Sequence, residues 1–229
     1  MAPDAYRTLK PVARVLGRLG ARVWINGLER IPSEGPFLLI SNHQSALDPI
    51  FIQAWAPREI HAMTKSTQFR HPLFRWLIPR LRGFPTRRYR VDPQAVRVAL
   101  RRLSEGKGVS IYAEGERTWD GRVHPFRRGT VRLALRAGVP IIPCGISGSF
   151  DVWPRWAGRP RRADVTVRYG EPIHWKAHRD RGERERALPE AAAALEAAVR
   201  DLVDEPSEAV DGIPTSLGRD GPDRRQPAQ

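Results

Sequence analysis

Short apolar runs alternate with amphipathic segments along most of the chain. Three of the runs, at residues 37–40, 109–113 and 139–146, carry no charged side chain, which is typical of strands buried on both faces of a parallel sheet. Weaker strand patterns occur at residues 22–27, 60–64, 83–88 and 163–169. Helical patterns fill the segments between them, at residues 5–20, 50–55, 71–82, 93–103, 130–137 and 183–203. This alternation predicts an α/β fold in which helices flank a mostly parallel central sheet.

The length and composition favour one domain with small additions. A chain of 229 residues suits a single substantial hydrophobic core. We expect an N-terminal amphipathic helical segment over residues 1–22, one domain over 23–203 and a disordered tail over 204–229. The tail is rich in Pro, Gly, Ser and charged residues, so it has almost nothing to bury. The single cysteine, Cys144, stands in no metal-ligand spacing, so we expect neither a disulfide framework nor a metal site.

Two segments combine bulky apolar side chains with basic ones. Residues 5–20 have an apolar stripe with Arg and Lys elsewhere, and residues 71–82 mix aromatic and aliphatic side chains with arginines. Either segment could lie on an anionic lipid surface, with 71–82 also able to form an acyl-chain wall, or could pack on its own domain as an ordinary helix. No run approaches the roughly 18 apolar residues of a spanning helix. We therefore expect a peripheral location at the cytoplasmic face of the cell membrane.

The charge balance points to an anionic partner. The net charge is +14 and is supplied almost entirely by arginine, whose planar fork suits bidentate contacts with phosphate. Nucleic acid, an acidic membrane surface and phosphorylated small molecules all satisfy this charge. The seven tryptophans form no repeat with basic residues, so they do not predict a base-stacking platform. No nucleic acid partner is expected.

Polar side chains follow the buried strand at residues 37–40. His43 and Asp48 stand there in the order Asn-His-x-x-x-x-Asp, and the carboxyl ends of parallel strands are where open α/β sheets bind ligands. The pair is a candidate general base with the carboxylate that orients it. Asp48 followed by Pro49 is also a helix start with Asp as N-cap, and the sequence leaves both roles open. The charged turn that begins at Glu114 follows a second buried strand in the same way.

Four blocks occur in an order that resembles the glycerolipid acyltransferase family, which includes the 1-acylglycerol-3-phosphate acyltransferases. They are Asn42 to Asp48, Gly83 to Arg88, Glu114 to Arg117 and Val139 to Pro143. The chain departs from the family pattern at Glu116, where the family most often has threonine. The second block is also shorter than its commoner form, so Arg87 and Arg88 both remain candidates for a phosphate-binding arginine, with Arg88 favoured.

The resemblance implies transfer of a fatty acyl group from acyl-CoA or acyl-acyl carrier protein to the free hydroxyl of a lysophospholipid, typically lysophosphatidate. His43 would take the hydroxyl proton, while Asp48 would fix the histidine tautomer and stabilise the imidazolium. The resemblance implies no cofactor and no metal. The alternatives are the same chemistry on another acceptor, such as a lyso-ornithine lipid, or a non-enzymatic basic protein that binds RNA or a membrane surface.

The same resemblance implies a site for the glycerol phosphate. Arg88 or Arg87 would bind it together with Arg117 through charge-assisted hydrogen bonds. Gly115 would let the backbone approach closely. Glu114 would orient an arginine rather than touch the phosphate.

Overall fold

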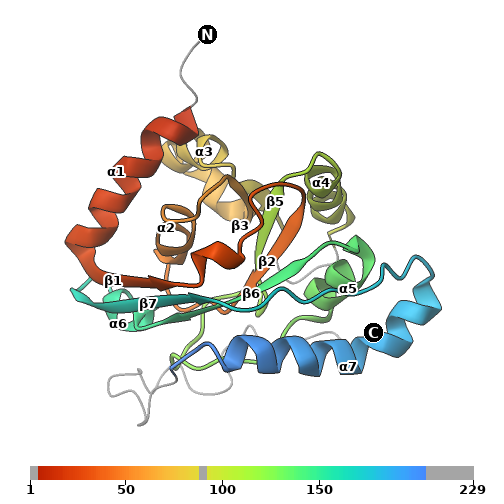
Figure 1. The fold of residues 1–229 in the computed structure, drawn as a ribbon. Coiled ribbons are helices and arrows are strands. Elements are labelled where there is room, and N and C mark those ends of the chain that lie inside the picture. Colours follow the sequence, from red (N-terminus) through yellow and green to blue (C-terminus); the bar gives the residue numbers. More distant parts are fainter. Residues whose placement is uncertain (1–4, 88–91, 205–229) are drawn as a thin grey trace.

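Seven strands form one sheet in the order β1-β7-β6-β2-β5-β3-β4 (Figure 1). The computed structural model describes residues 5–87 and 92–204. Its strands are β1 (Ala21–Asn26), β2 (Phe37–Ser41), β3 (Ile60–Lys65), β4 (Phe84–Thr86), β5 (Gly108–Tyr112), β6 (Ile141–Ser147) and β7 (Ala163–Tyr169). Its α-helices are α1 (Ala5–Gly20), α2 (Asp48–Gln53), α3 (Pro72–Arg80), α4 (Pro93–Ser104), α5 (Arg128–Ala137), α6 (Ser149–Val152) and α7 (Arg181–Arg200). The sequence patterns predicted all of these except α6, and they also missed the 3-10 helices η1 (Leu28–Arg30) and η2 (Ser66–Arg70).

Most neighbouring strands are parallel. The strands β6, β2, β5, β3 and β4 all run in one direction, whereas β7 pairs antiparallel with β6 and parallel with β1. The predicted α/β fold with a mostly parallel sheet is therefore confirmed. Because β2 lies between β5 and β6, the polar segments that follow these three strands emerge at the same edge of the sheet.

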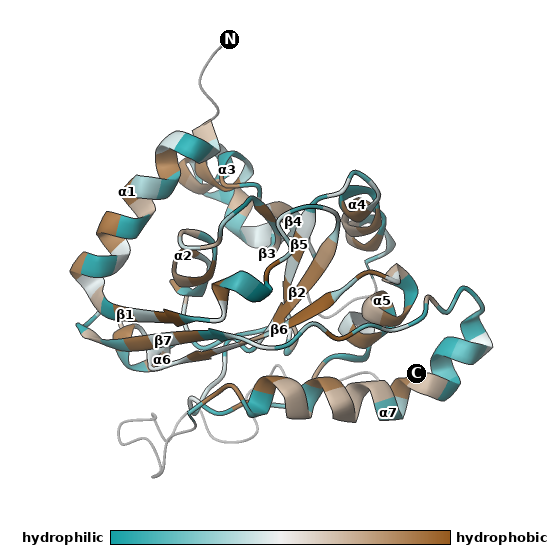
Figure 2. Ribbon diagram, in the orientation of Figure 1, coloured by the Kyte–Doolittle hydropathy of each residue, from teal (hydrophilic) through white to brown (hydrophobic). Residues whose placement is uncertain are grey.

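The two faces of the sheet carry separate hydrophobic cores. Along β2, Leu38 and Ile40 belong to the cluster that includes residues of α4, α5 and α7. Phe37 and Leu39 belong to the opposite cluster, which includes residues of α2. All four side chains are fully buried, and Figure 2 shows β2 as a hydrophobic strand between the layers. Side chains alternate between the faces of a strand, so burial on both faces requires the unbroken apolar run seen in the sequence.

Helix α1 contacts the rest of the molecule through its polar face. Lys10 and Arg14 donate hydrogen bonds to backbone carbonyls within residues 54–56. Gly17 makes room for Trp55, because a Cβ at this position would come within 2.8 Å of the indole ring. Four apolar residues of α1 face away and are exposed, at 52% for Val12, 59% for Val15, 57% for Leu16 and 71% for Leu19. The interpretation in which this apolar stripe packs on its own domain is therefore wrong.

Helix α3 also presents apolar side chains to the outside. None of its residues is buried, and Leu73, Phe74 and Trp76 are exposed by 55%, 39% and 50%. It is therefore not an ordinary core helix. In the part of the chain that the structure describes, no helix combines the length and the apolar character that crossing a bilayer requires.

The domain extends to Asp204, the first residue of the expected tail. Arg168 pairs with the Asp204 carboxylate at 2.8 Å, and the Asp204 backbone N–H donates to the hydroxyl of Ser147 at 2.9 Å. The boundary expected after residue 203 therefore falls one residue too early. The rest of the expected tail, residues 205–229, lies outside the described residues.

Candidate active site

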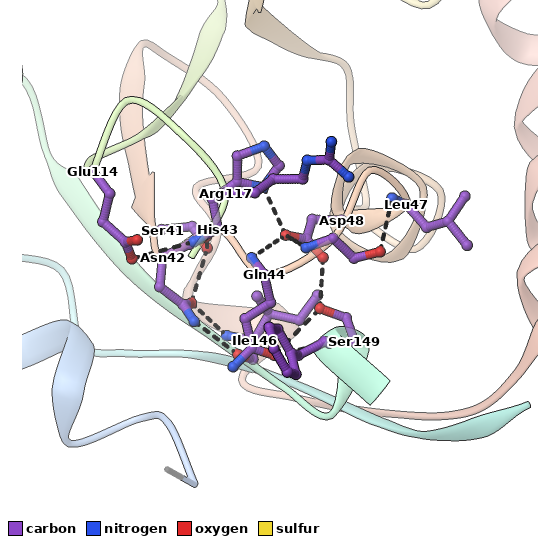
Figure 3. A network of polar contacts seen from close by, with 12 residues as sticks. Ser41, Asn42, His43, Gln44, Leu47, Asp48, Glu114, Arg117, Ile146 and Ser149 are labelled. Carbon is purple, nitrogen blue, oxygen red and sulfur yellow. Dashed lines mark hydrogen bonds and ion pairs between the residues drawn. The ribbon is translucent and has the colours of Figure 1, made fainter. Parts of the chain in front are cut away.

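The imidazole of His43 lies directly against the carboxylate of Asp48 (Figure 3). The distance from Nδ1 of His43 to Oδ2 of Asp48 is 2.7 Å, and the two side chains are exposed by only 8% and 0%. His43 follows the end of β2, and Asp48 is the first residue of α2. A carboxylate can only accept, so Nδ1 carries the proton, and the neutral imidazole keeps its lone pair on Nε2. This is the tautomer that a general base needs.

Four hydrogen bonds hold the Asp48 carboxylate in place. Besides His43, its Oδ2 atom accepts from the backbone N–H groups of Gln44 at 2.7 Å and Ser45 at 2.9 Å. Its Oδ1 atom accepts from the hydroxyl of Ser149 at 2.6 Å. The backbone donors precede α2, and the helix has no side-chain cap bond. A role for Asp48 as a helix cap alone is therefore wrong, because its side chain organises the histidine turn.

Residues from β5 and β6 fix the same turn. The side-chain amide of Asn42 donates to the Ile146 carbonyl at 2.9 Å and accepts from the Ile146 N–H at 2.8 Å. The ring of Tyr112 stacks on the His43 imidazole, with centroids 4.0 Å apart and planes 16° from parallel. These contacts restrict the imidazole to one orientation, which lowers the entropic cost of positioning it for proton transfer.

Ser149 is a site residue that the sequence analysis missed. It begins α6 directly after Gly148, where β6 has just ended, and it is fully buried. A signal for it exists in the sequence, since a polar residue behind a buried strand is the same pattern that drew attention to His43. The helix that carries Ser149 is too short to show a helical period of apolar residues in the sequence.

The turn after β5 is hydrogen-bonded to the turn after β2. The Thr118 N–H donates to the His43 carbonyl at 2.7 Å, and the Glu114 carboxylate accepts from the His43 N–H at 3.4 Å. Burial raises the pKa of Glu114 well above its usual range, and the charges of Asp48 and Asp120 raise it further. The Glu114 side chain thus contacts the backbone of the histidine turn. The arginine that Glu114 binds is Arg127, whose Nε donates to the backbone carbonyl of Glu114 at 2.9 Å and not to its carboxylate.

Gly115 has a conformation and an environment that favour glycine. Its φ angle is +76°, in the left-handed region, and a Cβ there would lie 2.3 Å from Nε of Arg127. The group that approaches this glycine within the protein is therefore the Arg127 side chain. Contact between Gly115 and a phosphate stays a prediction.

The predicted arginines take different positions. Arg117 is half-buried and lies beside His43 and Asp48 (Figure 3). Burial lowers its pKa, and the nearby charge of Arg155 lowers it further. Arg87 is exposed at the end of β4, which is two strands from β5 in the sheet, or roughly 10 Å at ordinary strand spacing. Arg88, the favoured candidate, lies outside the described residues.

The site therefore brings together a histidine with its carboxylate, a buried acid and an arginine. Within residues 5–87 and 92–204, no group of three or more His, Cys, Asp and Glu side chains has a metal-binding arrangement. The chemistry that these residues support is proton abstraction by Nε2 of His43 from a group held near Arg117.

Fold and site together define an α/β protein with a histidine–aspartate base at the carboxyl ends of a parallel sheet. Comparison with known families gives the narrower class. The chain belongs to the acyltransferase family, whose model matches residues 22–147, more than half of the sequence. The resemblance drawn from the four sequence blocks is confirmed.

Individual relatives agree with this assignment. A chloroplastic 1-acyl-sn-glycerol-3-phosphate acyltransferase of Brassica napus is 32% identical over 66% of this chain and 44% of its own length. The 1-acyl-sn-glycerol-3-phosphate acyltransferase of Pseudomonas aeruginosa is 29% identical over 81% of this chain and 70% of its own. The chain thus spans about half the length of the plant relatives that it matches.

A solved structure supports the fold. The 1-acyl-sn-glycerophosphate acyltransferase PlsC of Thermotoga maritima superimposes with a TM-score of 0.64. The match covers 86% of this chain and 83% of that protein, with 24% sequence identity. The two proteins therefore share their fold over most of both chains.

Proposed function

We propose that this protein transfers a fatty acyl group from an acyl thioester, acyl-CoA or acyl-acyl carrier protein, to the free hydroxyl of a lysophospholipid. The acceptor we favour is 1-acylglycerol 3-phosphate, which would give phosphatidic acid. The observation that carries the proposal is the buried 2.7 Å contact between Nδ1 of His43 and Asp48, which leaves Nε2 as the base. The names of the relatives support the choice of acceptor.

The reaction needs one proton transfer in each direction. The acceptor oxygen attacks the thioester carbonyl carbon while its proton passes to Nε2 of His43, and Asp48 stabilises the imidazolium that forms. The carbon–sulfur bond then breaks, and the imidazolium returns the proton to the leaving thiolate. The products are an ester and a free thiol. No acyl-enzyme and no cofactor are required.

The acceptor phosphate would bind near Arg117. Within residues 5–87 and 92–204 this half-buried guanidinium forms no hydrogen bond or close ion pair with a carboxylate, although the charge of Asp48 acts on it. A phosphate bound there would form charge-assisted hydrogen bonds and would place the acceptor close to His43. Arg87, at the end of β4, and Arg88, which lies outside the described residues, stay candidates for binding the same phosphate.

The substrate and product are lipids, and we propose that α1 and α3 hold the protein on an anionic membrane surface. The α1 residues Val12, Val15, Leu16 and Leu19 are exposed, with arginines alongside them. The exposed Leu73, Phe74 and Trp76 of α3 would extend this surface. Buried leucines contribute roughly 1.5–3 kcal/mol each, and each basic residue near acidic lipid about 1 kcal/mol. The proposed location is peripheral, at the cytoplasmic face.

The test is acyl transfer by the purified protein. Radiolabelled acyl-CoA would be supplied with 1-acylglycerol 3-phosphate, a lysophosphatidylcholine or a lyso-ornithine lipid, and the lipid products separated. We expect labelled phosphatidic acid from the first acceptor. His43→Ala should reduce kcat by about 10²–10⁴-fold, the usual worth of general-base catalysis.

The matched control is His174→Ala, which removes an exposed histidine after β7. It should retain wild-type turnover. Normal turnover by His43→Ala would refute the mechanism. Absence of transfer to every acceptor, combined with salt-sensitive binding to RNA, would refute the enzymatic function in favour of a basic RNA-binding protein.

A further inference from the structure

Arg155 is held at the edge of the candidate site by three contacts with one turn. It lies between α6 and β7, far along the chain from the turn that follows β5. Its guanidinium pairs with Glu116 at 2.9 Å and donates to the Arg117 carbonyl at 3.4 Å. It also lies over the indole of Trp119, 3.7 Å from the ring centroid. An arginine with only 20% of its side chain exposed has lost much of its freedom to move into solvent.

The carboxylate that holds Arg155 is the residue at which the chain departs from the family pattern. Oε2 of Glu116 pairs with Arg155, and Oε1 lies 3.5 Å from a terminal nitrogen of Arg127. The Glu116 side chain is 23% exposed. The extra negative charge is therefore committed to arginines, so it does not face a ligand as an isolated carboxylate.

Three arginines lie close together around this turn. Arg127 and Arg155 share the carboxylate of Glu116, and Arg117 lies near both Arg155 and the carboxylate of Asp48. Arg155 is close enough to Arg117 to disfavour the charged form of that residue. Cations that crowd each other in a partly buried place are stabilised by an added anion, since their repulsion falls when opposite charge lies between them.

We propose that Arg155 is a further specificity-determining residue that binds phosphate together with Arg117. In the absence of phosphate, the Glu116 carboxylate binds Arg155 and keeps its guanidinium beside the site. The planar guanidinium is already oriented by Trp119, so little further ordering is required for a bidentate contact. This inference rests on the proposed function. Beyond that function, it assigns phosphate binding to Arg155, which lies outside the four sequence blocks, and the positioning of Arg155 to Glu116.

The ligand chemistry is a phosphate ester, and two substrates of the proposed reaction carry one. They are the lysophospholipid acceptor and the CoA form of the donor. Steady-state kinetics separates them, because Arg155→Ala should raise the KM of whichever substrate uses the residue. We expect a rise of about tenfold or more for 1-acylglycerol 3-phosphate, with the KM of acyl-CoA unchanged. An increase only in the KM of acyl-CoA would show that Arg155 binds a phosphate of the donor.

Direct binding tests the inference without relying on turnover. Titration calorimetry with sn-glycerol 3-phosphate should show at least tenfold weaker binding to Arg155→Ala than to the wild-type protein. Arg159→Ala, which removes an exposed arginine of the same loop, is the matched control and should bind as the wild type does. If Arg155→Ala has a lowered melting temperature, Arg155→Lys replaces it, since lysine keeps the charge but loses the fork.

Equal dissociation constants for wild type, Arg155→Ala and Arg155→Lys would overturn the inference, whatever the activity. Loss of phosphate binding in the Arg155 variants of a protein that transfers no acyl group would uphold the phosphate site and refute the proposed function. Failure of the inference and failure of the proposed function are therefore distinguishable.

Discussion

The substitution Asp48→Asn isolates the charge of Asp48 from its geometry. Three N–H donors, from His43, Gln44 and Ser45, converge on the single atom Oδ2. The other oxygen accepts only from the hydroxyl of Ser149. An asparagine can keep its oxygen toward the three donors and turn its NH₂ group toward Ser149, whose hydroxyl also accepts. All four hydrogen bonds and the histidine tautomer are then preserved, and only the negative charge is lost.

The size of the effect follows from electrostatics. The carboxylate stabilises the imidazolium in the transition state, and two unit charges about 4 Å apart interact by about 4 kcal/mol at an effective dielectric constant of about 20. Loss of that interaction slows the reaction by about 10³-fold. The change in unfolding free energy should stay near 1–2 kcal/mol, because the hydrogen bonds weaken without being broken. For a chain of this length that is a few degrees in melting temperature.

The assay is release of free CoA, followed with a thiol reagent. Background reaction is low because the single cysteine, Cys144, is fully buried. Asp48→Ala is the control, and it should lose both turnover and several degrees of melting temperature, since it leaves buried donors without a partner. A kcat for Asp48→Asn within about tenfold of the wild type, at equal KM, would refute the charge-stabilising role.

Three further outcomes follow from the structure. Ser149→Ala removes one charge-assisted hydrogen bond from Asp48, worth about 1.5–3 kcal/mol, and should lower kcat with little change in KM; an unchanged kcat would contradict this. Leu16→Asp should weaken sedimentation with acidic vesicles, whereas the exposed Arg159→Ala should not, and equal binding by both would contradict the proposed membrane surface. Burial, followed by the charge of Arg102, lowers the pKa of His61 to about 4 from its ordinary 6.5. The unfolded chain therefore takes up this proton first, and up to about 3 kcal/mol of stability is lost as pH falls from about 6.5 to about 4. His61→Gln should show a flatter dependence of melting temperature on pH over that range, and identical curves would contradict this.

The apolar pattern was sufficient to predict the strands of the sheet. A strand that is buried on both faces avoids charged side chains at every position, so it is visible as a continuous run in the sequence. The runs at β2, β5 and β6 carry no charged side chain, and each was placed within a few residues of its observed bounds. The same pattern located the edge where the strands end, and with it His43 and Asp48. The residue types at that edge also follow from the sequence, since an imidazole five positions before a carboxylate can reach it across one turn.

The tertiary structure alone decided which partners those side chains have. Ser149 reaches Asp48 across 101 positions of the chain, and Arg155 reaches Glu116 across 39. No local periodicity encodes contacts at such separations, because they depend on which strands become neighbours in the sheet. The role of Asp48 was open for the same reason, since a cap and an orienter have the same sequence pattern and differ only in the direction of the side chain.

The orientation of α1 likewise depends partly on the sequence and partly on the tertiary structure. Its sequence determines an amphipathic helix, because apolar and basic residues fall on different faces. Nothing in that pattern states which face meets the protein, since an apolar stripe is stabilised equally by a core and by a lipid surface. The tertiary structure determines the orientation of α1. Gly17 packs against Trp55, and Lys10 and Arg14 donate to backbone carbonyls within residues 54–56, so the apolar face stays exposed.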